Sequence, residues 1–242
     1  MNLIQLFTAI ANAIRAKTGS SETIKAENFP TEINSIPSGG GYPPDWSEIG
    51  YEDTPASIIN DFNYAKEIQE NWDNSITSMN NKYLSNINLK IFPLVDTSNV
   101  ITMNNTFSGS ELTDISLINT SNVTSMNNTF RSCKNLISFP IINTSKVADF
   151  GTCFAGCKLL KNFPVLDTSS VTGYGFRNTF STCDSLSNES LNNILRMCIN
   201  TKNVYSNLRT LSSVGLTSEQ ATICQELSNY QAFLDAGWTT GY

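Results

Sequence analysis

Asp96-Thr97-Ser98-Asn99-Val100 opens a pattern that the chain repeats three more times. The later copies are Asn119-Thr120-Ser121-Asn122-Val123, Asn143-Thr144-Ser145-Lys146-Val147 and Asp167-Thr168-Ser169-Ser170-Val171. Successive copies begin 23, 24 and 24 residues apart. A fixed period in this range predicts a solenoid, in which each repeat buries its apolar face against its neighbours.

Other positions keep the same register. Each copy continues with an apolar residue, a phenylalanine, a small residue and a leucine, and two copies end in Phe-Pro: Met103, Met126 and Phe150; Phe107, Phe130, Phe154 and Phe180; Ser110, Cys133, Cys157 and Cys183; Leu112, Leu136, Leu160 and Leu186; Phe139-Pro140 and Phe163-Pro164. An earlier, degenerate copy contains Met79, Tyr83, Leu89 and Phe92-Pro93. This agreement across columns predicts a repeat region over residues 75–187.

Within each repeat, the Leu-x-x-Phe-Pro-x-Ile/Leu segment and the Val-x-x-Met segment are each too short for an ordinary helix. We expect short extended pieces joined by a helical turn at Asn-Asn-Thr-Phe, with Asp/Asn-Thr-Ser as a second turn whose side chains bind nearby backbone amides. Stacking at strand spacing, about 4.8 Å per repeat, would give a rod roughly 20–25 Å long. The expected fold class is an α+β repeat solenoid, capped by helices at both ends and preceded by a small helical hairpin.

The run Asp-Thr-Ser-Asn-Val-x-x-Met-x-x-Thr-Phe-x-x-Cys-x-x-Leu resembles the BspA-like leucine-rich repeat family, over about residues 75–190. The resemblance implies a leucine-rich repeat stack of the kind found in surface adhesins and in many phage-encoded proteins. It says little about the ligand, because solenoid folds bind many different partners.

Composition excludes several classes of function. The net charge is −6, the pI is about 4.7 and no run of Lys and Arg occurs, so we expect no nucleic-acid partner. No apolar run is long enough for membrane insertion, and we expect no ordinary secretory signal, because residues 1–5 contain no basic residue. Histidine is absent, which removes Ser-His-Asp and Cys-His catalysis.

The six cysteines occupy Cys133, Cys153, Cys157, Cys183, Cys198 and Cys224. Three share a repeat column with Ser110, which favours unpaired, buried thiols over a disulfide framework. Cys153 and Cys157 could form half of a metal site, but no second pair matches them. We therefore expect no metal and no cofactor.

Residues 1–36 contain two amphipathic segments, of which the first ends at Gly19. They are too small to fold alone with much stability, so we expect them to pack in an oligomer or on another protein. The expected attachment residues are Leu3, Leu6, Phe7, Ile10, Ile14, Ile33 and Ile36. The run Ala-Asn-Ala-Ile-Arg-Ala-Lys-Thr-Gly at residues 11–19, followed by Pro-Thr-Glu-Ile-Asn-Ser-Ile at residues 30–36, resembles an amino-terminal module of phage tail and other structural proteins. The resemblance implies attachment to other virion proteins, with a homotrimer favoured. The alternative is a hairpin that merely caps the domain.

Residues 37–45 are a Gly- and Pro-rich linker by composition. From Thr54 the apolar spacing is helical, and we expect residues 46–74 to cap the first repeat. The aromatic residues of this segment could instead form a sugar-stacking surface.

The last repeat is two residues longer than the others between its Val and Phe positions. Insertions in solenoids emerge as loops, often on the binding face. Within Gly173-Tyr174-Gly175-Phe176-Arg177, the predicted ligand-binding residues are Tyr174, Phe176 and Arg177, which would suit a glycan or a protein. The alternative is that the insertion only fits the last repeat to its cap.

Residues 188–242 form the expected carboxy-terminal cap. We expect a helix from Ser190 to Met197, a strand or edge segment from Leu208 to Leu216, a helix from Thr217 to Leu227, and a short helix before Gly237.

These features predict a non-enzymatic phage structural protein of the tail, baseplate or head surface. It would be made in the host cytoplasm, reside on the outer surface of the virion, and bind a host surface protein or glycan or decorate the particle. The alternative is a bacterial cell-surface adhesin of the same repeat family. A glycan-active enzyme is less favoured, because the acids Asp96 and Asp167 share a column with asparagines and so read as turn residues.

Overall fold

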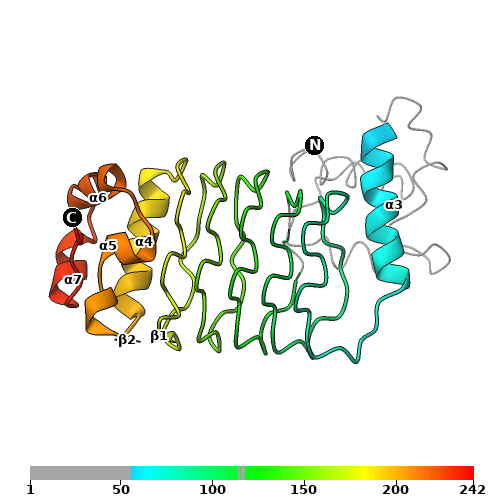
Figure 1. The fold of residues 1–242 in the computed structure, drawn as a ribbon, viewed down its shortest axis with the longest axis horizontal. Helices are drawn as coiled ribbons and strands as arrows, with labels where there is room; N and C mark the ends of the chain where they lie inside the picture. The colour runs from blue at the N-terminus through cyan, green and yellow to red at the C-terminus, as the bar shows by residue number, and fades with distance from the viewer. Residues whose placement is uncertain (1–55, 114, 116–117) are drawn as a thin grey trace, which may run out of the picture. The chain divides into compact units, whose positions relative to one another are not determined.

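The computed structural model describes residues 56–113, 115 and 118–242. The chain divides into two units between Lys66 and Glu67, and the second unit, residues 67–242, contains the whole repeat region. Figure 1 shows the coils of this unit lying side by side, followed by a group of short helices.

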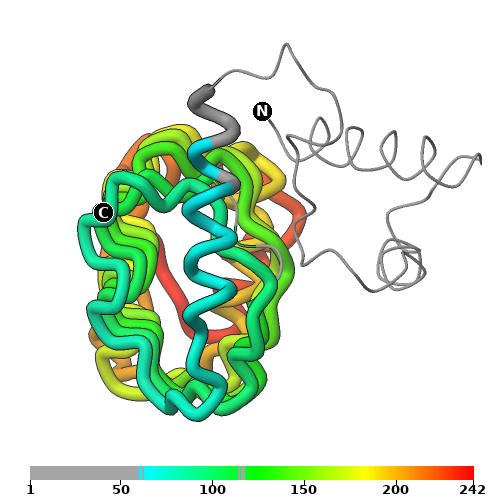
Figure 2. The backbone as a smooth tube through the Cα atoms, turned by 90° about the vertical axis from the view of Figure 1, so that its right-hand side faces the viewer, coloured from blue at the N-terminus to red at the C-terminus, as the bar shows by residue number. Residues whose placement is uncertain are grey.

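The repeat region consists of five successive coils of chain. We number them coil 1 to coil 5, for residues 77–100, 101–123, 124–147, 148–171 and 172–187. Viewed along their common axis, the coils superimpose on one another (Figure 2). Isolated parallel bridges join equivalent positions of the first four, linking Ser78 to Thr102, Thr102 to Ser125, and Ser125 to Asp149.

A ladder of backbone hydrogen bonds holds neighbouring coils together. In coil 2, alternate residues donate their amides to coil 3: Met103 to Ser125, Asn105 to Asn127, Phe107 to Thr129, and Gly109 to Arg131, at 2.7–3.0 Å. The corresponding amides of coils 1, 3 and 4 donate to the next coil in the same way. The coils are therefore joined much as parallel strands are, although few of their residues adopt a regular extended conformation.

Two left-handed positions in every coil make this ladder possible. The first is occupied by Asn81, Asn105, Asn128, Thr152 and Asn178, and the second by Ser85, Gly109, Ser132, Gly156 and Thr182, all with φ between 53° and 82°. In coil 2, the amides of Thr106 and Ser110 donate to the carbonyls three residues earlier, which closes a turn around each left-handed residue. Positive φ at the third residue is the geometry of a type II turn.

The predicted helical turn at Asn-Asn-Thr-Phe is therefore wrong. Its second Asn adopts the left-handed conformation that Asn tolerates better than most residues. The amide of that Asn then points to the next coil instead of to a carbonyl four residues back.

Two columns of phenylalanine fill the interior. Rings of neighbouring coils lie parallel in the first column, with centroids 5.5 Å apart between Phe107 and Phe130 and 5.4 Å between Phe130 and Phe154. The second column contains Phe139 and Phe163, which meet the first edge to face; Phe139 lies 5.1 Å from Phe130. All are buried, and both arrangements are favourable for aromatic rings.

The Asp/Asn-Thr-Ser segments form the turns that the sequence predicts. The amides of Ser98, Ser121, Ser145 and Ser169 each donate to the Asp or Asn side chain two residues earlier, at 2.9–3.1 Å. The threonine between them is buried, and its hydroxyl donates to a carbonyl of the next coil: Thr97 to Asn119, Thr120 to Asn143, and Thr144 to Asp167.

Helix α3, Ala56–Glu70, precedes the coils, as the spacing from Thr54 predicts. Within the second unit, Gln69 and Trp72 donate side-chain hydrogen bonds to the carbonyls of Leu94 and Asp96 in coil 1. The Trp72 ring also meets Phe92 edge to face. These contacts agree with a capping role for residues 46–74, which stays a prediction for the segment as a whole.

The carboxy-terminal cap is mainly helical. Its elements are α4 (Asn188–Asn200), η3 (Ser206–Leu208), α5 (Leu211–Val214), α6 (Ser218–Gln225) and α7 (Tyr230–Asp235), and strand β2 (Asn203–Val204) pairs in parallel with β1 (Thr172–Gly173) of coil 5. Thr217 is the N-cap of α6, and it forms a capping box with Gln220. Helix α4 buries Leu191, Ile194 and Leu195, the apolar face that its sequence predicts.

The strand or edge segment predicted between Leu208 and Leu216 is largely wrong, because α5 occupies Leu211–Val214 and, within this segment, an isolated bridge forms only at Thr210, to Thr239. Thr210 caps α5 by accepting a hydrogen bond from the amide of Ser213, and Gly215 ends the helix with φ of 100°. Helix α5 also ends the ladder: the amides of Asn178 and Phe180 donate to Ser213 and Val214. A Cβ on Gly215 would lie 2.6 Å from the amide nitrogen of Ser181, so glycine is needed here.

The predicted attachment hairpin, residues 1–36, and the linker, residues 37–45, lie outside the described residues. The assignment of the coils to a BspA-like leucine-rich repeat solenoid stays a prediction. Among the helices that the structure describes, none is long and apolar enough to cross a bilayer.

Phe130 tests the ring column, because it lies between two parallel neighbours and is fully buried. We expect Phe130→Ala to lower the free energy of unfolding by about 3–5 kcal/mol, from lost burial and the cavity left behind. Urea denaturation followed by circular dichroism measures the change. The control is Ile87→Ala, which removes a side chain that is 69% exposed in coil 1 and should cost under about 0.5 kcal/mol. Equal effects of the two substitutions would contradict a column-based core.

Candidate functional site

The repeat pattern is broken at the start of coil 5. Phe150 of coil 4 donates its amide to Gly175, just as Met126 of coil 3 donates to Asp149. Gly175 is thus the equivalent of Asp149, and the two inserted residues are Gly173 and Tyr174. The following Phe176 continues the buried column of Met103, Met126 and Phe150.

The structure does not support Phe176 as a ligand contact. Its side chain is 3% exposed and packs edge to face against Phe180 and Trp238. The spacing contained a signal for this, because Phe176 precedes Phe180 by four residues, as Met103 precedes Phe107. Tyr174 and Arg177 are exposed and adjacent, since the Arg177 amide donates to the Tyr174 carbonyl. Their role in binding stays a prediction.

Tyr174 forms an exposed pair with Tyr205, a residue that the sequence pattern did not single out. The ring centroids lie 5.0 Å apart with an interplanar angle of 68°, and the side chains are 60% and 53% exposed. The tyrosines directly follow the paired strands β1 and β2, which fix their separation. Tyr205 also lies against Gly173: a Cβ there would be 3.6 Å from the ring. That distance is an ordinary contact, so glycine is favoured at this position by its φ of 55° and not by crowding against the ring.

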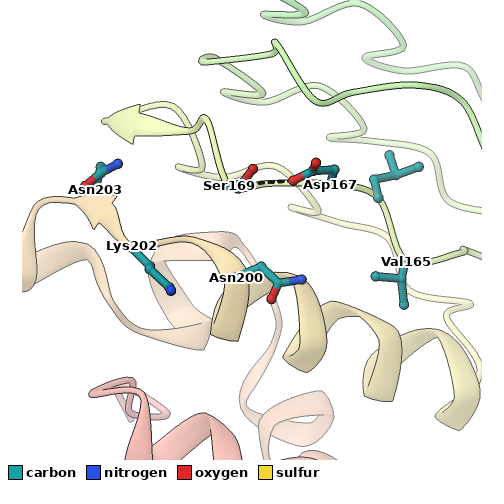
Figure 3. Close-up of a pocket in the computed structure, with 7 residues that line it drawn as sticks. Val165, Asp167, Ser169, Asn200, Lys202 and Asn203 are labelled. Atoms are coloured by element: carbon teal, nitrogen blue, oxygen red, sulfur yellow. Dashed lines mark hydrogen bonds between the residues drawn. The ribbon is translucent and has the colours of Figure 1, made fainter.

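A pocket of about 590 Å³ lies beside the same strand pair, between the last Asp-Thr-Ser turn and the end of α4 (Figure 3). It is lined by Val165, Leu166, Asp167, Ser169, Asn200, Lys202 and Asn203. Asn203 belongs to β2, and Tyr205 follows two residues later on the same exposed side, with buried Val204 between them. The pocket and the tyrosine pair are thus joined through one short strand.

The pocket arises where coils give way to helices. Thr168 donates its hydroxyl to the Met197 carbonyl of α4, at the place where earlier threonines donate to the next coil. The helix thereby occupies the position of the turn that would complete coil 5, without reproducing that turn. In the earlier coils, the turn of the next coil lies beside the polar side of each Asp/Asn-Thr-Ser turn. Beside the Asp167 turn this neighbour is missing, and the polar side of the turn borders the pocket.

The charges in the pocket are one carboxylate and one ammonium group, Asp167 and Lys202. Hydrogen bonds from the hydroxyl and the amide of Ser169 hold the pKa of Asp167 below its ordinary value. The carboxyl group is therefore ionised at neutral pH and accepts hydrogen bonds only. With Ser169, Asn200 and Asn203, the site offers donors and acceptors around a small apolar surface from Val165 and Leu166.

The cysteines offer no comparable chemistry. All six are free and buried, and desolvation raises the pKa of Cys133 and Cys183 to about 12. Three thiols donate to carbonyls of the preceding coil: Cys133 to Phe107, Cys157 to Phe130, and Cys183 to Phe154. Cys153 takes the position held by Thr106 and Thr129 in other coils. Within the described residues, no group of three or more acids and cysteines could hold a metal ion.

Comparison with known proteins gives one partial match. A family model described as a Mycoplasma protein of unknown function, DUF285, matches residues 56–162. The matched region covers coils 1 to 3 and part of coil 4, and it ends before the tyrosine pair and the pocket. Neither the curated proteins nor the solved structures contain a match to the chain.

Asp167 has a turn role that can be separated from its charge. Asn119 and Asn143 accept the same hydrogen bond in their coils, so Asp167→Asn should preserve the turn. Asp167→Ala should lower stability at pH 7 by about 1 kcal/mol, through the lost hydrogen bond. Because the folded-state pKa is lowered, the carboxylate contributes stability at neutral pH that is lost as pH falls below about 4. Thermal unfolding at pH 7 and pH 3 measures both effects. We expect the melting temperature to fall less between pH 7 and pH 3 in Asp167→Asn than in wild type, and an equal fall would contradict this assignment.

The buried thiols should resist modification in the folded protein. A raised pKa keeps them protonated, and only the thiolate is a strong nucleophile. We expect a disulfide reagent such as dithionitrobenzoate to react with none of the six within minutes at pH 8, and with all six in 6 M guanidinium. Absorbance at 412 nm measures the reaction. Rapid reaction of a native thiol would contradict the burial of that column.

Proposed function

We propose that the protein is a non-enzymatic structural component of a phage particle, whose coils bind a molecule on the host surface. The observation that carries the proposal is the exposed Tyr174–Tyr205 pair beside a polar pocket, at the point where an otherwise regular stack is interrupted. A rigid scaffold with a surface of aromatic and hydrogen-bonding groups suits recognition.

The amino-terminal resemblance supports the phage assignment. Residues 1–36 would attach the chain to other virion proteins through Leu3, Leu6, Phe7, Ile10, Ile14, Ile33 and Ile36, most simply as a trimer. The protein would be made in the host cytoplasm and reside on the outer surface of the particle. The coils would be of the BspA-like leucine-rich repeat type. The match to DUF285, a family related to those repeats, supports a relation to this type of repeat.

A bacterial surface adhesin is the second candidate. The description of the matched family names a bacterium, Mycoplasma, and the match covers most of the coils. In both candidates the coils bind a surface molecule, and the two differ in what the chain is attached to.

Antibodies against the full chain discriminate the candidates. Immunogold labelling of purified phage particles should decorate the virion, and the unpermeabilised cells that encode the protein should stay unlabelled before lysis. Labelling of those cells, with none on particles, would establish the adhesin instead.

Two variants of the full chain test which part of the molecule attaches to the particle and which part binds the host cell. Phe7→Asp should abolish incorporation into particles, because a charge replaces an apolar attachment residue, and should leave binding to host cells unchanged. A double variant, Tyr174→Ala with Tyr205→Ala, should lower cell binding at least tenfold while incorporation is kept. Ile87→Ala serves as the control for removing an exposed apolar side chain. Full cell binding by the double variant would refute the assignment of the site.

A further inference from the structure

We infer that the ligand of this site is an uncharged glycan chain, with one sugar ring stacked on the Tyr174–Tyr205 pair and the next sugar in the adjoining pocket. The inference rests on the proposed function and specifies its ligand class. Three properties of the site carry it: the aromatic surface, the kind of polar groups, and the balance of charge.

The aromatic surface fits a sugar ring. One face of a pyranose is formed by C–H groups and packs well against an aromatic ring, while its hydroxyls remain at the edge. Tyr174 and Tyr205 present such surface where a ligand reaches it, and their near-perpendicular rings form a corner. The strand pairing fixes the backbone from which each ring projects, so the separation of the two tyrosines is set before a ligand binds.

The polar groups fit hydroxyls better than they fit a peptide. Asn200 and Asn203 each provide an amide that both donates and accepts, Asp167 accepts, and Lys202 donates. Adjacent hydroxyls of a sugar, which also donate and accept, can satisfy such mixed groups over a short distance. An apolar anchor pocket, as peptide recognition usually requires, is small here, since only Val165 and Leu166 contribute.

The charge balance selects an uncharged chain. Asp167 and Lys202 offset each other, and the whole protein carries a net charge of −6. A polyanion would meet Lys202 in the pocket and Arg177 beside Tyr174, but also the Asp167 carboxylate on a protein of net charge −6, so its electrostatic gain would be small. The volume of about 590 Å³ lies in the usual range for small-molecule sites, roughly 300–1,000 Å³.

The direct test uses cell-wall polysaccharide from the host, freed of protein with proteinase K and separated from its anionic fraction by ion exchange. Immobilised full-length protein should bind the uncharged fraction in biolayer interferometry. Periodate, which cleaves the vicinal diols of sugars, should reduce this binding at least tenfold. Failure of the uncharged fraction to bind, or binding that survives periodate, would overturn the inference.

Matched variants connect the binding to the site. Tyr174→Ala and Tyr205→Ala should each weaken binding about tenfold, as expected for a lost stacking contact. Tyr174→Phe should stay within about threefold of wild type, because the ring is kept. Asp167→Asn keeps the turn and should weaken binding severalfold, since hydrogen bonds to a charged group are about twice as strong. Wild-type affinity in both Ala variants would overturn the inference.

Whole-cell binding separates this inference from the proposed function. If cells bind the protein through the tyrosine pair but binding is lost after proteinase K and not after periodate, the ligand is a protein; the glycan inference then fails and the proposed function stands. If this protein does not bind the cells at all, the proposed function fails. Binding of the isolated polysaccharide in biolayer interferometry then still tests the ligand class.

Discussion

The structure depends on a backbone amide that points out of each turn toward the next coil. A chain of consecutive turns would normally satisfy its amides internally, as a helix does. Here two left-handed residues per coil, such as Asn105 and Gly109, rotate the peptide groups so that alternate amides face one direction. The remaining amides close the turns themselves. Both sets are satisfied, which a buried backbone requires.

The side chains inside the coils follow from that arrangement. Stacking at strand separation places identical residues of successive coils in contact, so a flat ring is well suited to fill each layer. The threonine and cysteine columns provide polar contacts between coils. Each of these small side chains has one donor, which reaches the carbonyl of a neighbouring coil. The repeated residues therefore make the same contacts in successive coils, and the coils differ mainly in their exposed residues.

The repeat columns and the Asx turns could be read from the sequence, because each depends on residues close together or at a fixed period. Phe107 and its equivalents are buried and stacked as a regular column suggests. The left-handed Asn positions were missed, because Asn-Asn-Thr-Phe contains no glycine, the residue that most often indicates a left-handed position in a turn. Leu208–Leu216 was misread although Leu208, Leu211 and Val214 lie three residues apart, a helical spacing, with the Thr210 cap and Gly215 on either side of α5.

The site was predictable only in part. Tyr174 stands out as an insertion, but Tyr205 and Lys202 come from a segment with no repeat to compare with. They approach coil 5 through a strand pair of two residues each, too short for periodicity to reveal. Phe176 shows the converse limit: an aromatic residue beside an insertion attracts attention, yet the register of its own column assigns it to the interior.

The way α5 terminates the ladder has a consequence for assembly. Asn178 and Phe180 direct their amides to Ser213 and Val214, so the last coil does not end in a row of free donors. Coils with such a row at one face and matching acceptors at the other would be self-complementary and would join molecule to molecule into filaments of indefinite length. The small α5 segment, closed by Gly215, therefore occupies the donors to which a coil of another molecule would have to bind.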